Sequence, residues 1–256
     1  MVFVHILNPY GMAWLRRTNE NSVDLNRNFL LKGAYAGAPE GLAPLDPFLN
    51  PQSPPGPELL FNLKFLWLIT RYGMASLKQS VAGGQYKYPK GLFYGGKKLE
   101  EGPVKYQAWL KRRLKGVKRL VFIDVHSGLG PWGEDSLLVE PEFYGLEQKA
   151  FGNRVYANKP QQGPSYKTRG GILAMTRHVA SRAESHIVCQ EFGTFNIIRV
   201  LRALRQENRW HHWGGGSLSH RSKAELKEAF CPDSLAWRNA IMDRGKSLIE
   251  QSLGLL

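Results

Sequence analysis

The chain has 256 residues and a net charge of +14, and its 43% apolar content is enough for one globular domain with a full core. No stretch reaches the roughly eighteen consecutive apolar residues of a membrane helix, and the first residues lack the basic region and cleavage site of a secretory leader. Two cysteines, Cys189 and Cys231, are too few for a disulfide framework, so we expect a single cytoplasmic domain over residues 1–256.

The first quarter of the chain is predicted to contain a strand, a loop and a helix. Residues 2–7 are mostly apolar and end at the turn Asn8-Pro9-Tyr10-Gly11, which predicts a strand. Seven prolines between Ala38 and Glu58 favour an extended loop without helix. From Glu58 to about Tyr72 the apolar residues recur at helical spacing, which predicts a helix.

Positive charge is concentrated between Lys64 and Arg119, where 14 Lys and Arg residues face only two Glu residues. Such a segment attracts nucleic acids, acidic membranes or acidic small molecules, and composition does not select among them. Aromatic residues between the lysines are compatible with base stacking. The glycines and proline nearby predict an irregular loop, however, and no nucleic-acid-binding motif accompanies them. A solvated basic face is therefore the simpler interpretation.

The rest of the chain alternates predicted helices and strands. Strands are expected at residues 119–125, 136–139 and 185–191. Helices are expected at residues 104–115, 142–153, 171–183, 195–210, 222–229 and 232–252. This order predicts an α/β fold with a mixed, mostly parallel twisted sheet that is flanked by helices on both faces.

Two of these strands end in a titratable residue, His126 and Glu191. If both strands are parallel, the imidazole and the carboxylate lie at the same edge of the sheet, where they could serve as a metal ligand and a general base. A third cluster, residues 22–29, places Arg27 beside amide side chains, and the planar arginine fork suits carboxylate recognition. A hydrogen-bonded core histidine and ordinary turn chemistry are the structural alternatives.

In this order the segments resemble the zinc carboxypeptidases of the M14 class, and most closely a bacterial-type branch known as the DUF2817 domain. The resemblance covers residues 2 to about 213 and is carried by residues 8–11, 24–29, 124–127, 166–171 and 190–194. It implies the zinc carboxypeptidase fold and one catalytic Zn²⁺. It also implies that His126 is a zinc ligand and that Glu191 is the general base that activates water.

The resemblance assigns substrate contacts as well. Asn26 and Arg27 match the pair that holds the terminal carboxylate of the substrate, and Tyr166 matches the phenol that caps it. Arg16 lies where the family keeps the arginine that polarises the scissile carbonyl, although Arg17 is adjacent. The implied substrate is a peptide or an acylated amino acid with a free carboxylate.

One departure from the family is important. Its first two zinc ligands form a His-x-x-Glu motif before the Asn-Pro-x-Gly turn, and none of the seven histidines here is followed by Glu three residues later. We therefore expect an N-terminally truncated copy with an impaired zinc site. A sheet that lacks its first strands would leave one edge exposed. A zinc-free pseudoenzyme, or recruitment of other ligands such as His211 and His212, are the alternatives.

The function predicted on this basis is a metallocarboxypeptidase-like hydrolase that cleaves an amide bond next to a free carboxylate. A deacylase of the same superfamily that acts on acylated amino acids is the nearest alternative, because the same side chains serve both reactions. The rival from another class is a non-catalytic protein, either a pseudoenzyme that keeps the carboxylate pocket or a nucleic-acid binder that uses residues 64–119.

Overall fold

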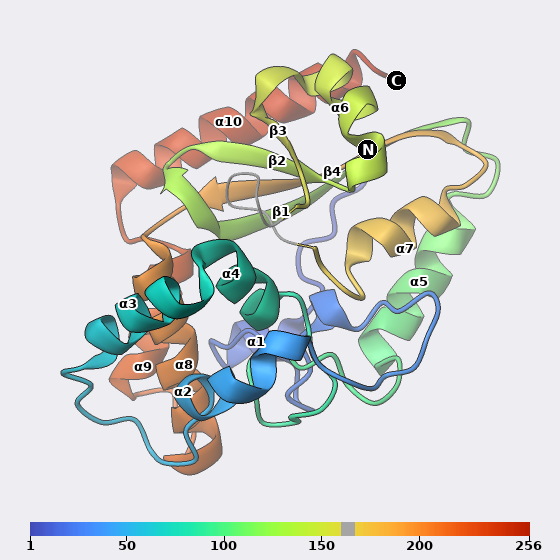
Figure 1. Ribbon diagram of the computed structural model, residues 1–256. Coiled ribbons are helices and arrows are strands. Elements are labelled where there is room, and N and C mark those ends of the chain that lie inside the picture. The colour runs from blue at the N-terminus through green and yellow to red at the C-terminus, as the bar shows by residue number, and fades with distance from the viewer. Residues whose placement is uncertain (160–166) are drawn as a thin grey trace.

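Four strands form one sheet in the computed structural model, which describes residues 1–159 and 167–256 (Figure 1). They lie side by side in the order β1 (Arg119–Trp132), β4 (Glu184–Gly193), β2 (Asp135–Val139) and β3 (Val155–Ala157). β1 and β4 are parallel, as are β2 and β3, whereas β2 and β4 are antiparallel. The predicted mixed, mostly parallel sheet is confirmed.

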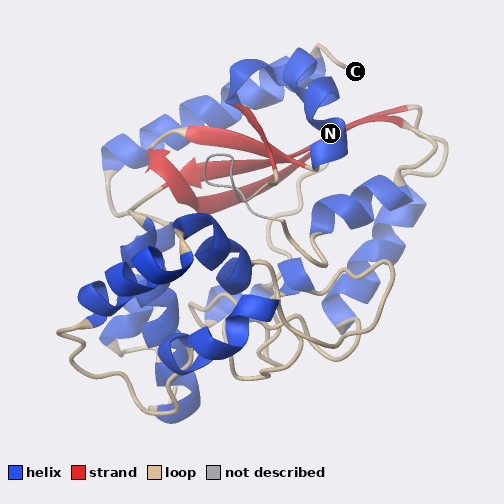
Figure 2. Ribbon diagram, viewed as in Figure 1, coloured by secondary structure: helices blue, strands red, loops and turns tan. Residues whose placement is uncertain are grey.

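Helices cover both faces of the sheet (Figure 2). One face packs against α6 (Tyr144–Phe151) and α10 (Leu235–Leu253) through a core that includes Leu137, Val188 and Leu248. The opposite face packs against α5 (Glu101–Arg113) and α7 (Ile172–Val179) through a second core cluster. Because successive side chains of a strand point to opposite faces, neighbours such as Ile187 and Val188 belong to different cores.

A further group of helices lies beyond the carboxyl ends of β1 and β4 (Figure 1). It consists of α3 (Phe61–Tyr72), α4 (Met74–Ala82), α8 (Ile197–Trp213) and α9 (Arg221–Phe230), together with the short α2 (Asp46–Leu49). These helices share a separate apolar core to which α3, α4, α8 and α9 all contribute. The carboxyl edge of the sheet therefore faces a helical layer, which lies next to His126 of β1 and Glu191 of β4.

The predicted strand over residues 2–7 is wrong. The segment pairs with no strand among residues 1–159 and 167–256, and the side chains of Val2, Phe3 and Val4 are exposed. Apolar composition favours a strand, but a strand needs a hydrogen-bonded neighbour, and only Leu7 packs onto the core. The turn that follows is a short helix, α1 (Pro9–Ala13), and the Asn8 side chain caps it by accepting the Gly11 N–H at 3.0 Å.

The prediction of a helix-free loop over residues 38–58 is also wrong. This region contains a 3₁₀ helix (Glu40–Leu45) followed by α2. Four of its seven prolines, Pro51, Pro54, Pro55 and Pro57, follow these helices and lie outside them. Pro44 lies inside the 3₁₀ helix, and Pro47 occupies the first turn of α2. There its missing N–H costs nothing, because first-turn N–H groups have no partner within the helix.

Other boundaries differ in smaller ways. Helix α3 begins at Phe61, three residues later than predicted, and it is followed by α4, which was not predicted. β3 was also missed, because its three residues are too few to show a periodicity. The expected exposed edge is found at β1, where β4 is the only neighbour in the described part of the chain and Val125 is 64% exposed.

Within residues 1–159 and 167–256, no helix has both the length and the apolar character needed to cross a lipid bilayer. Cys189 is buried and Cys231 is exposed, and both are free thiols.

Candidate functional site

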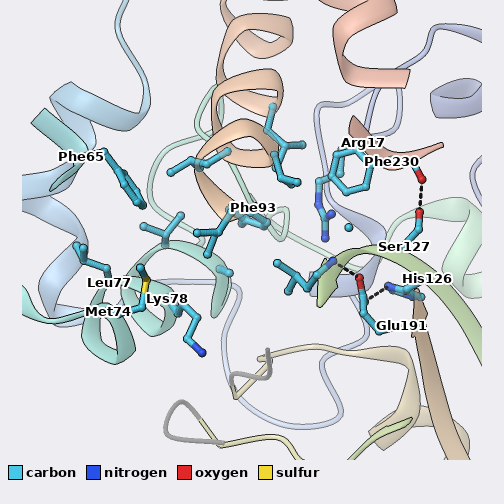
Figure 3. A pocket seen from close by; sticks show the side chains of 18 residues that line it. Arg17, Phe65, Met74, Leu77, Lys78, Phe93, His126, Ser127, Glu191 and Phe230 are labelled. Carbon is cyan, nitrogen blue, oxygen red and sulfur yellow. Dashed lines mark hydrogen bonds and ion pairs between the residues drawn. The ribbon is translucent and has the colours of Figure 1, made fainter. Parts of the chain in front are cut away.

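Four chemically active side chains project from one face of β1 and β4. The strands pair in register, with Asp124 opposite Cys189 and His126 opposite Glu191. Because each pair is separated from the next by two residues along its strand, all four side chains lie on the same face. The predicted meeting of His126 and Glu191 at the carboxyl edge of parallel strands is therefore found, and Figure 3 shows the two side chains facing each other.

Glu191 is a buried carboxylate that is held from one side. It is 6% exposed, and its Oε1 accepts the backbone N–H of Leu129 at 2.9 Å (Figure 3). Burial raises the pKa of Glu191, although the charge of His126 and the Leu129 hydrogen bond oppose this effect. A carboxylate of raised pKa is suited to accept a proton near neutral pH.

Backbone geometry after His126 brings Leu129 to Glu191. The strand register shifts between Ser127 and Trp132, and Gly128 in this segment has φ +136°. A Cβ at Gly193, where β4 ends against the shifted segment, would lie 1.8 Å from the Pro131 carbonyl oxygen. A side chain at either glycine would displace this segment, so the Leu129–Glu191 contact depends on both.

His126 is oriented by a second carboxylate. Its Nε2 lies 2.8 Å from Asp124 Oδ2, and its Nδ1 lies 4.0 Å from Glu191 Oε2. Burial alone would lower the pKa of His126, but the charge and hydrogen bond of Asp124, together with the charge of Glu191, raise it to about 9. The imidazole is therefore cationic at neutral pH as long as both carboxylates are charged and no metal displaces its proton.

Asp124, His126 and Cys189 form a group of potential metal ligands. One ligand atom from each lies within 4.8 Å of the other two. Burial, with the nearby charges of Asp124 and Glu191, raises the pKa of the Cys189 thiol well above its usual range. A metal ion would reverse this preference, because a coordinated thiol loses its proton. Oxygen, nitrogen and sulfur donors at one point are a combination that Zn²⁺ accepts.

Arg17 lies at the candidate site, whereas the predicted Arg16 packs against α8. Arg17 lines the cavity beside His126 and Glu191 (Figure 3). Its Nε donates to Asp24 Oδ2 at 2.8 Å. Arg16 is buried elsewhere, 3.7 Å from Glu207 of α8. The hydrogen bond with Asp24 orients Arg17 toward the site.

Asn26 lines the site, whereas Arg27 is buried beside it and contacts the backbone. Asn26 lines a cavity with His126 and Glu191, and its Oδ1 accepts the Ile172 N–H at 3.0 Å. Arg27 is 0% exposed, and its guanidinium donates to the carbonyl oxygens of Ala82 and Asn26. These contacts give Arg27 a structural role in holding the loop that carries Asn26.

Two cavities meet at His126 and Glu191. The first, of about 90 Å³, extends among apolar side chains of α3, α4 and α8. The second, of about 70 Å³, has a more polar lining, which includes Asn26, Asn158 and Thr168. The carboxylate of Glu191 therefore stands between an apolar and a polar space.

Comparison with known proteins assigns a family to this arrangement. A family model described as "Protein of unknown function (DUF2817)" matches residues 1–244. The chain belongs to the DUF2817 family. No curated protein and no solved structure is detectably similar to it.

The remaining predicted site residues of this DUF2817 protein are Tyr166 and the pair His211 and His212. Tyr166, the predicted substrate-capping residue, lies outside the described residues. His211 and His212, the alternative metal ligands, lie near the end of α8 in contact with each other and are not among the Asp124–His126–Cys189 group.

The histidine pair predicts a pH dependence of stability. Burial and the charge of Arg16 lower the pKa of His211 to about 3 and that of His212 to about 4. The unfolded chain therefore takes up protons below pH ~6.5 that the folded chain does not, and stability falls as the pH decreases. We expect the double change His211→Asn, His212→Asn to make the loss of unfolding free energy between pH 7 and pH 5 smaller, as measured by urea titration. His178→Asn, at an exposed site, is the control, and an unchanged pH slope in the double variant would contradict the assignment.

The contacts of Arg27 predict a large effect on stability. In Arg27→Met, the partly buried carbonyl oxygens of Ala82 and Asn26 lose their side-chain donor, so we expect the free energy of unfolding to fall by about 2–4 kcal/mol. Urea unfolding followed by circular dichroism measures it, with the exposed Arg71→Met as the matched control. A variant of unchanged stability and a raised KM would instead support the substrate-binding role predicted from the sequence.

Sequence reasoning missed three members of this DUF2817 site. Asp124 was noticed only as part of a motif, Cys189 only as a reduced thiol, and Arg17 only as a neighbour of Arg16. A usable signal was present for the first two, because each lies two residues before a predicted site residue on a strand. The choice of Arg17 had no local signal.

Proposed function

We propose that this DUF2817 protein is a zinc-dependent hydrolase that cleaves an amide bond next to a free carboxylate. The observation that carries the proposal is the in-register pair His126 and Glu191, with Asp124 and Cys189 behind it on the same face of the sheet. The resemblance of residues 124–127 and 190–194 to segments of the M14-class zinc carboxypeptidases supports the same reaction. Peptides and acylated amino acids are the candidate substrates.

The residues that would hold the ion in this proposal are Asp124, His126 and Cys189. Their donor atoms lie within 4.8 Å of one another, and three protein ligands are the number that a catalytic zinc site uses. Asp124 and Cys189 would thus take the place of the His-x-x-Glu pair of the M14 class, a motif that this sequence does not contain. A bound Zn²⁺ would supply Lewis acidity toward the attacking water and the carbonyl oxygen.

The proton transfers are assigned to Glu191. Its buried carboxylate takes a proton from the attacking water as the new carbon–oxygen bond forms, and it returns that proton to the nitrogen as the carbon–nitrogen bond breaks. The N–H of Leu129 holds Oε1 and so fixes the direction of the carboxylate. A base that is fixed and buried loses little energy to reorientation or solvent during the reaction.

In this proposal, Arg17 stabilises the negative charge that develops on the carbonyl oxygen of the substrate. Its guanidinium is close enough to lower the pKa of Glu191 and of His126, so it acts on the same space as both. Asp24 fixes the arginine through its Nε, and the buried Asp24 has a pKa held below its usual range by Arg17 and Arg27 despite burial. A positioned cation of this kind stabilises an oxyanion more than the neutral carbonyl.

The proposal is tested by metal-dependent amide hydrolysis. Protein loaded with Zn²⁺ is incubated with N-acyl amino acids and with dipeptides, and release of a primary amine is measured. We expect turnover that a chelator removes and added Zn²⁺ restores, with one equivalent of metal per chain. Turnover that is unaffected by complete metal removal would contradict the zinc-dependent reaction.

A further inference from the structure

The apolar cavity beside Glu191 has an unusual composition for an interior void. One end is formed by Arg17, His126, Ser127 and Glu191, Lys78 of α4 also lines the cavity, and the other lining side chains of the helical layer and its neighbours are mostly apolar (Figure 3). The apolar lining includes Phe65, Leu77, Val81, Leu201, Leu204 and Phe230. Four of these residues belong to the buried core around α3, α4 and α8.

A space of about 90 Å³ exceeds the voids that normal packing leaves. Water gains little there, because it needs two to four polar partners and, apart from Lys78, the walls distant from Glu191 offer mainly hydrocarbon. An apolar group that enters gains both dispersion contacts and release from solvent. The cavity therefore suits a hydrocarbon chain or ring whose polar end remains at Glu191.

We propose that this cavity is the subsite for an apolar acyl chain, so that the substrate is an amino acid whose nitrogen carries an aliphatic or aromatic acyl group. This inference rests on the proposed hydrolase function. It places the scissile carbonyl at Glu191, between the two cavities. Hydrolysis then adds water across the carbon–nitrogen bond and releases a carboxylic acid from the apolar cavity and a free amino acid from the polar one.

The polar cavity fits the second half of such a substrate. It is lined by Asn26, Thr168 and Asn158 and opens on the other side of the same His126–Glu191 pair. Amide and hydroxyl groups offer hydrogen bonds to an amino-acid backbone, which the apolar cavity does not. The asymmetry between the two spaces thus favours an acylated amino acid over a peptide with polar residues on both sides.

The test separates binding from turnover. Octanoate and butanoate, which represent the released acid, are titrated into the zinc-loaded protein by calorimetry. Each added methylene buried in the cavity should tighten binding by about fourfold, so we expect octanoate to bind on the order of 100-fold more tightly than butanoate. Equal affinities for the two acids would overturn the subsite.

A variant that fills the cavity provides the second measurement. Val81→Trp places a ring into the space from α4, and Ser76→Trp places the same ring on the exposed side of that helix. We expect Val81→Trp to abolish the preference for octanoate and Ser76→Trp to keep it, with thermal melting to confirm that both variants fold. Loss of the preference in both variants, or in neither, would overturn the assignment.

Hydrolysis distinguishes this inference from the function on which it rests. We expect kcat/KM for N-octanoylglycine to exceed that for N-butanoylglycine, which is shorter by the same four methylenes, on the order of 100-fold, and the difference to disappear in Val81→Trp. Hydrolysis of both amides at equal rates would overturn the acyl-chain subsite while supporting the hydrolase. Chain-length-dependent binding of the acids without hydrolysis of any amide would support the apolar subsite and contradict the proposed hydrolase.

Discussion

Glu191→Gln is expected to abolish amide hydrolysis while the chain keeps its metal. Glutamine preserves the size of the side chain and the acceptor for the Leu129 N–H, but it takes up no proton from the attacking water. Loss of a general base lowers kcat by about 10²–10⁴-fold, so we expect turnover to fall by at least 100-fold. Steady-state kinetics on an N-acyl amino acid, with metal content measured on the same sample, provides the test.

Glu140→Gln is the matched control, because Glu140 also lines the polar cavity but forms an ion pair with Arg177 at 3.4 Å. We expect this variant to retain kcat within a few fold of the unmodified protein. If Glu191→Gln retained more than a tenth of the turnover, the proton transfers would have to be assigned to another group. If it lost its metal, the carboxylate would be acting in metal binding.

Cys189→Ala is expected to weaken metal binding strongly. In the proposed site Cys189 is one of three protein ligands, and the removal of a ligand leaves Asp124 and His126 to hold the ion. We expect the Kd for Zn²⁺ to rise by at least about 100-fold. Substitution of Zn²⁺ by Co²⁺ adds a direct readout, because thiolate coordination gives a charge-transfer absorption that oxygen and nitrogen ligands lack.

The exposed thiol of Cys231 provides the control for this experiment. We expect Cys231→Ser to keep both the affinity and the charge-transfer band, and Cys189→Ala to lose both. Thermal melting without metal checks that the alanine variant is folded, since it removes only a small buried group. Absence of a thiolate band in the Co²⁺-loaded unmodified protein would exclude Cys189 from the ligand set.

Much of the site was predictable because its signals are local. About ten residues are enough to predict an apolar strand together with the functional residue at its end, His126 or Glu191. The helices between the two strands indicated that the strands pair in parallel. Because side chains alternate between the two faces along a strand, Asp124 must lie on the same face as His126, and Cys189 on the same face as Glu191. The strand predicted at residues 2–7 was wrong because pairing is not a local property.

The sequence by itself determined the α/β class, the places of β1, β2 and β4 in the chain and the meeting of His126 with Glu191. Only the tertiary structure decided which arginine faces the site, since Arg16 and Arg17 are adjacent and the contact with Asp24 separates them. It also decided that Arg27 is buried against Ala82, a residue distant in the chain, and that helices beyond the sheet enclose an apolar cavity. These outcomes depend on contacts between distant segments, and periodicity along the chain carries no information about them.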